Sequence, residues 1–144
     1  MLLRDDQQAA LAELRATAAG LVVRYRSLSE GDVDERLGAL LADVAERRQV
    51  LVDELAECAR ERGDEPTAAD LELNQYRALG DRLTAWALGQ ELSLERIADA
   101  EQAWLERLHE IESLAWRPSE QGVIARLLQD ARDMLSELQA LGSG

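Results

Sequence analysis

Lysine and phenylalanine are absent from this sequence, and cysteine and histidine occur once each. Because all 16 basic residues are arginine, chemistry that depends on a lysine amine, such as Schiff-base formation or a P-loop, is excluded. Cys58 is the single cysteine, so the chain can form neither an intramolecular disulfide nor a metal centre with several thiolate ligands. This cysteine usage favours a reducing, cytoplasmic location.

Aromatic residues and proline are also scarce, at 3% and two residues respectively, which argues against a β-sandwich built on aromatic and β-branched strands. The abundance of Leu and Ala indicates an all-α protein. The sequence contains no apolar run long enough to span a membrane, and we expect neither a signal peptide nor an anchor. A formal net charge of -13 repels phosphates, so we expect no binding to nucleic acid or to a membrane surface.

Apolar residues recur at steps of three and four along most of the chain, which is typical of amphipathic helices. Turn and capping signals interrupt this pattern near residues 29–32, 63–66, 89–93 and 117–118. Asp32 is the predicted N-cap of the second helix, and Gly63 the predicted end of that helix. The predicted helical segments are 3–28, 33–62, 67–90, 94–115 and 118–141.

These segments predict an antiparallel helical bundle of four long helices plus a shorter helical segment, because long helices joined by short turns pack as neighbours. We assign residues 1–141 to a single domain and 142–144 to a flexible or non-native tail. The segment 67–90 contains Gly80 and Gly89 and is the weakest helix. It is either a member of the bundle or a return segment packed outside it.

The chain contains several short motifs: Tyr25-Arg26, Arg48 with Leu51 and Glu54-Leu55, Gly63-Asp64-Glu65-Pro66, and Glu101. Their order resembles that of a bacterial ferritin-like family of unknown function. The resemblance covers most of the chain, but the chain departs from the family pattern because it lacks a glycine before Glu101. The resemblance implies a ferritin-like four-helix bundle and carries no activity.

Arg48 and Glu101 each occupy a position where the helical pattern requires an apolar side chain, and each is the only charged residue on its stripe. A lone buried charge is costly, whereas a bidentate contact between guanidinium and carboxylate offsets much of that cost. We therefore predict a structural ion pair that fixes the register of two helices. The alternative is that Arg48 extends its head group to solvent.

A ferritin-like metal centre takes carboxylates from two helices and a Glu-x-x-His pair from each of the other two. Glu106 and His109 have the spacing of such a pair, but no second histidine exists, so a complete site is impossible. A degenerate iron or manganese site formed by Glu46, Glu101, Glu106 and His109 is an alternative hypothesis. The competing interpretation places Glu106 and His109 on a solvated helical face, with no cofactor bound.

Apolar residues outside the main stripes predict an interaction surface, most simply that of a symmetric homodimer. Trp104 and Cys58 are expected in the core instead, with Cys58 acting as a small buried hydrophobe. The leading hypothesis is a non-enzymatic protein that acts through association with itself or with a protein partner. The second hypothesis is a carboxylate-rich metal-binding or redox bundle. The predicted interface residues are Leu79, Trp86, Leu88 and Trp116.

Overall fold

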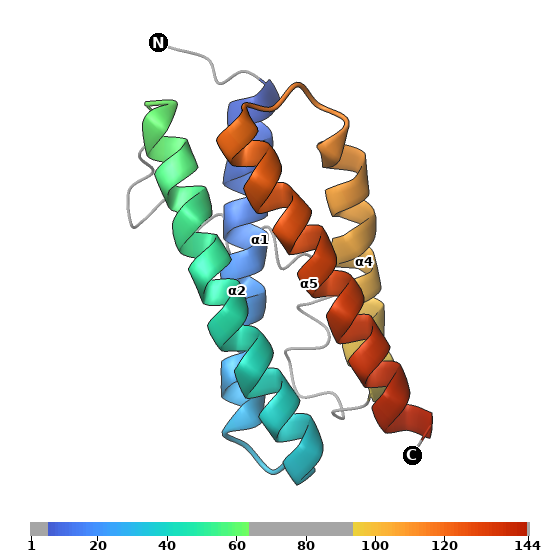
Figure 1. Ribbon diagram of the computed structural model, residues 1–144. Coiled ribbons are helices and arrows are strands. Elements are labelled where there is room, and N and C mark those ends of the chain that lie inside the picture. Colours follow the sequence, from blue (N-terminus) through green and yellow to red (C-terminus); the bar gives the residue numbers. More distant parts are fainter. Residues whose placement is uncertain (1–5, 64–93, 144) are drawn as a thin grey trace.

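Four helices account for most of residues 6–63 and 94–143, which are the residues that the computed structural model describes. These ranges contain no strand, so the predicted all-α class is confirmed. None of these helices is long and apolar enough to cross a membrane. The helices are α1 (Asp6–Ser29), α2 (Glu35–Glu61), α4 (Leu94–Glu112) and α5 (Pro118–Ser143) (Figure 1).

The four helices form a bundle in which α2 and α4 run in the same direction, while α1 and α5 run in the opposite direction (Figure 1). The principal side-by-side pairs among the described helices are α1/α2, α2/α5 and α4/α5. Helix α2 therefore ends at the end of the bundle opposite to the start of α4. Segment 67–90, which we predicted to be either a bundle member or a return segment, lies outside the described residues.

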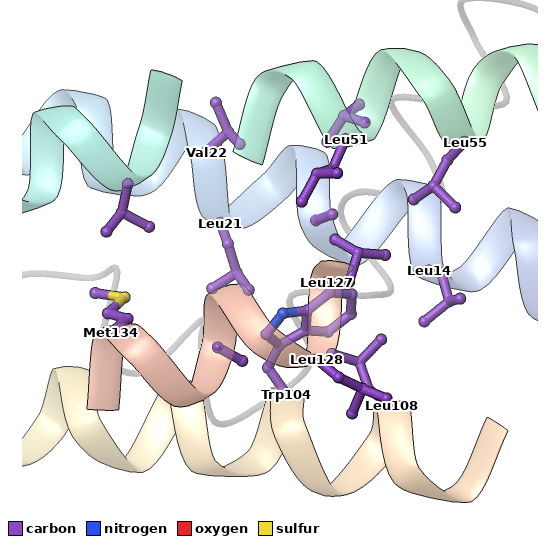
Figure 2. Close-up of a cluster of buried hydrophobic side chains, with 14 of the residues drawn as sticks. Leu14, Leu21, Val22, Leu51, Leu55, Trp104, Leu108, Leu127, Leu128 and Met134 are labelled. Atoms are coloured by element: carbon purple, nitrogen blue, oxygen red, sulfur yellow. The ribbon is translucent and has the colours of Figure 1, made fainter. Parts of the chain in front are cut away.

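The core is made of Leu, Ala, Val and Ile side chains from all four helices, with the Trp104 indole ring between them (Figure 2). Each of the four described helices supplies apolar residues to this core, because steps of three and four keep one face of a helix turned inward. Helix α1 is apolar over a wider arc than a single stripe, because Ala16 and Val22 are buried as well as Leu14, Ala18 and Leu21. Trp104 is in the core, as expected.

The turn between α1 and α2 is where the structure corrects a predicted cap. Asp34, not Asp32, is the N-cap of α2, and its carboxylate accepts hydrogen bonds from the backbone N–H groups of Arg36 and Leu37 at 3.1 and 3.2 Å. Both aspartates follow Gly31 in a polar turn, so composition alone cannot choose between them. The position at which α2 begins decides which aspartate is the cap, because an N-cap side chain accepts from the N–H groups two and three residues after itself.

The remaining helix ends follow the predicted signals with two corrections. Helix α2 is followed by Gly63 at a positive φ of 79°, and α5 begins at Pro118, whose fixed φ suits a first helical turn. Helix α4 ends at Glu112, so Ala115 is exposed rather than part of its buried stripe. Helix α5 continues to Ser143, beyond the predicted helical end at residue 141.

The cap assignment predicts different effects for two neighbouring aspartates. We expect Asp34→Ala to lower the free energy of unfolding by about 1 kcal/mol, because two backbone N–H groups of α2 lose their acceptor. Asp32→Ala is the matched control and should change it by less than about 0.5 kcal/mol. Urea unfolding followed by circular dichroism measures both. Equal losses in the two variants would contradict the assignment.

Candidate functional site

One polar cluster lies in the interior of the bundle, and each described helix contributes one of its side chains. We call this cluster the arginine centre. Its members are Tyr25 of α1, Arg48 of α2, Glu101 of α4 and Asp130 of α5. The first three side chains are completely buried, and the Asp130 side chain is 9% exposed. Charged groups at this depth require partners to offset their lost hydration.

Arg48 and Glu101 form the ion pair that the sequence predicts. Nη1 and Nη2 of Arg48 donate to Oε1 and Oε2 of Glu101 at 2.5 and 3.0 Å, which is a bidentate arrangement. The pair joins α2 to α4, which are not among the principal side-by-side pairs of the described helices. The alternative that Arg48 extends to solvent is wrong, because its side chain is fully buried.

Asp130 and Tyr25 complete the set of contacts around this pair. Asp130 Oδ2 accepts from Arg48 Nε at 2.9 Å and lies 2.9 Å from Nη2, and the Tyr25 hydroxyl donates to Glu101 Oε1 at 2.7 Å. The Arg48 guanidinium carbon also lies 5.8 Å from the centre of the Tyr25 ring, within the range of a cation–π contact. Arg47 Nε lies 3.4 Å from Asp130 Oδ1 and extends the network toward solvent.

The network keeps Arg48 charged and Tyr25 neutral. Burial by itself lowers the pKa of Arg48, but the charge and hydrogen bonds of Glu101 outweigh burial and raise the pKa well above its ordinary value. Burial also raises the pKa of Tyr25, and the nearby charge of Glu101 raises it further. Neither group therefore changes protonation near neutral pH, so neither serves there as a general acid or base.

The candidate metal ligands do not converge in the structure. Glu101 is buried and already accepts hydrogen bonds from Arg48 and Tyr25, whereas Glu46, Glu106 and His109 are exposed. His109 contacts Glu112 through Nδ1 at 3.0 Å, not Glu106. No metal-binding group of three His, Cys, Asp or Glu side chains occurs within residues 6–63 and 94–143. The hypothesis of a degenerate metal site is therefore corrected. One of its four residues is buried and three are exposed, so they do not surround one ion.

Trp116 is the one predicted interface residue that the structure describes, and its position corrects that prediction. Trp116 is only 7% exposed, so it belongs to the core and is not an interface residue. Its indole N–H donates to the Ile111 carbonyl oxygen at 2.9 Å, which anchors the loop between α4 and α5. Leu79, Trp86 and Leu88 lie outside the described residues.

A second buried ion pair joins the end of α2 to the start of α5. The Arg62 guanidinium makes a two-point contact with the Glu120 carboxylate and stacks over the Trp116 ring at 5.9 Å. Glu120 also accepts from the Arg117 backbone N–H at 2.9 Å, which caps α5 at its first turn. Burial would raise the pKa of Glu120, but the hydrogen bonds from Arg62 and from the Arg117 N–H, together with the positive charges of both arginines, outweigh burial and lower the pKa.

Cys58 lies in this region of the bundle as a small buried hydrophobe, as expected. Burial raises the pKa of its thiol, and the charge of Glu120 raises it further. A raised pKa lowers the thiolate fraction at neutral pH. Cys58 is therefore suited to packing and not to nucleophilic catalysis.

Sequence reasoning missed three residues of these two ion-pair networks. Asp130 lies three residues after Leu127 and four before Met134, so its spacing places it on the same face of α5 as these two core residues. Glu120 occupies the third position of α5, where a carboxylate commonly caps a helix, and this signal was available. No sequence signal pointed to Arg62, whose partner comes from a distant helix.

No family model, curated protein or solved structure matches this chain. The geometry of the described residues therefore carries the functional argument.

The arginine centre predicts a defined order of stability among variants. Glu101→Ala should lower the free energy of unfolding by about 3 kcal/mol, the lower end of the range for a broken buried pair, because Asp130 still accepts from Arg48. Glu101→Gln keeps a neutral acceptor and should cost less. Replacing both Arg48 and Glu101 by Leu should be milder than Glu101→Ala. Urea midpoints give this order, and a double variant less stable than Glu101→Ala would contradict it.

The pair between Arg62 and Glu120 predicts a pH-dependent difference. Because the folded pKa of Glu120 is lowered, its contribution is fully present above the unfolded value of about 4.3 and is lost as pH falls through the folded pKa. Glu120→Gln should therefore be less stable than the unaltered chain at pH 7, and this difference should shrink below about pH 4. Thermal midpoints between pH 7 and 3 measure it. Glu57→Gln, which removes an exposed carboxylate, is the control.

Proposed function

We propose that this chain is a non-enzymatic helical-bundle protein that acts through association with itself or with a protein partner. The observation that carries the proposal is that the arginine centre is saturated by its own members. Every nitrogen of the Arg48 guanidinium and both oxygens of Glu101 have hydrogen-bond partners within the chain. The head groups of Arg48 and Glu101 thus offer a substrate no free nitrogen or oxygen, which supports a role at the surface.

The path of the chain supports a ferritin-like assignment within this proposal. Ferritin-like bundles have one long crossover connection, which joins two helices of the same direction. Helices α2 and α4 have this relation in Figure 1, and 30 residues, numbers 64–93, separate their described parts. Such topology carries no activity, because one fold supports many functions.

The described surface favours electrostatic contact with a partner. Its exposed large hydrophobic side chains are Val23 and Val50, at 60% and 57% exposure, and they lie on different helices. The chain carries 29 acidic residues against 16 basic ones, so its field attracts a partner with a basic surface. We propose that Leu79, Trp86 and Leu88 form an apolar surface for self-association. A cytoplasmic location belongs to the same proposal.

Light scattering at 10 to 200 µM protein tests self-association. We expect a dimer that Leu79→Glu and Leu88→Glu convert to a monomer, because a charge in an apolar interface is costly. Val23→Glu and Val50→Glu are matched controls and should leave the dimer intact, since both side chains are already exposed. A monomer at every concentration would remove self-association from the proposal and leave a protein partner.

Elemental analysis of protein purified without chelators tests the metal-binding alternative. We expect far less than one iron or manganese ion per chain, because the four candidate ligands do not converge. A near-stoichiometric metal would overturn the non-enzymatic proposal and support the redox bundle. Purification from medium supplemented with iron and manganese makes the test stringent.

A further inference from the structure

The contacts around Arg48 surround its head group on two edges and one face. Glu101 binds the edge formed by Nη1 and Nη2, Asp130 binds the edge formed by Nε and Nη2, and Tyr25 covers the face. Three different helices thus hold a cation that the fourth helix supplies. We propose that the arginine centre is a binding site for a guanidinium ion, and that Arg48 is the tethered ligand of that site.

The geometry is specific for a planar guanidinium ion. The carboxylate oxygens lie 2.5 to 3.0 Å from the nitrogens along two adjacent edges, which matches the fixed fork of guanidinium donors. The Tyr25 hydroxyl holds Glu101 in place through its 2.7 Å hydrogen bond. A metal ion instead requires several oxygens at about 2.0 to 2.6 Å around one point.

The charges require a cation at this position. Without Arg48, the carboxylates of Glu101 and Asp130 would face the space that its guanidinium fills, with Arg47 Nε 3.4 Å from Asp130 Oδ1. Two such groups repel each other and attract an external cation. In carboxylate bundles of the ferritin-like kind, this attraction holds metal ions between side chains that four helices supply. Here the chain supplies the cation itself, and the centre excludes a metal.

Chemical rescue of Arg48→Ala tests the proposal. This truncation removes the guanidinium group and leaves space for a free one, while Glu101, Asp130 and Tyr25 are unchanged. We expect 10 mM guanidinium chloride to raise the Tm of Arg48→Ala by about 4 °C or more if Kd is about 1 mM, at ionic strength held constant with sodium chloride. General denaturation at this concentration lowers Tm by less than about 1 °C.

Three controls isolate the site. The unaltered chain should show no rise, because Arg48 fills the site. Arg126→Ala, which removes an exposed pair with Glu54, should show none either. The double variant Arg48→Ala with Glu101→Ala should lose the response, because one edge of the site is gone. An equal rise in all four proteins would be a general salt effect and would overturn the proposal.

Two further outcomes are decisive. If Mn²⁺ at equal concentration stabilises Arg48→Ala more than guanidinium does, the centre selects charge and not shape, and the proposal is wrong. If Arg48→Ala is unfolded in buffer, recovery of helical circular dichroism on titration with guanidinium supports the proposal, and no recovery overturns it. The test concerns the isolated chain, so its result is independent of the proposed association.

Discussion

The contact between Arg48 and Glu101 is the interaction on which the interior of this bundle depends. It joins α2 and α4, and through Asp130 and Tyr25 it reaches α5 and α1 as well. Apolar contacts stabilise a bundle but do little to fix the register of its helices, because one leucine can replace another. A bidentate pair with two further partners has one good geometry, so it favours one alignment of the helices.

The second ion pair acts at one end of the bundle, where apolar packing gives way to loops. Arg62 and Glu120 fix the end of α2 against the start of α5, and the Trp116 ring lies beside them. Glu120 therefore has two roles, since it also caps its own helix. The two ion pairs thus give the charges that the fold removes from solvent partners within the chain, and the association proposed above is assigned to the acidic surface.

The same geometry distinguishes this bundle from helical bundles that hold metal ions. A metal centre requires unpaired carboxylates that converge, whereas Glu101 is engaged by a guanidinium and a hydroxyl. The exposed Glu106 and His109 have the spacing of a metal motif on the wrong face of α4. Spacing along a helix is thus a necessary condition for a site but not a sufficient one, because the face must also point inward.

The sequence by itself determined the helices, their buried stripes and the anomaly of two charges inside them, because these features depend on local periodicity. It determined Gly63 and Pro118 as boundaries for the same reason, since both act through their own backbone. Only the tertiary structure decided that Asp130 and Tyr25 join Arg48, that Arg62 meets Glu120, and that Trp116 is buried. These contacts join residues distant in sequence, and helix packing alone sets which faces meet.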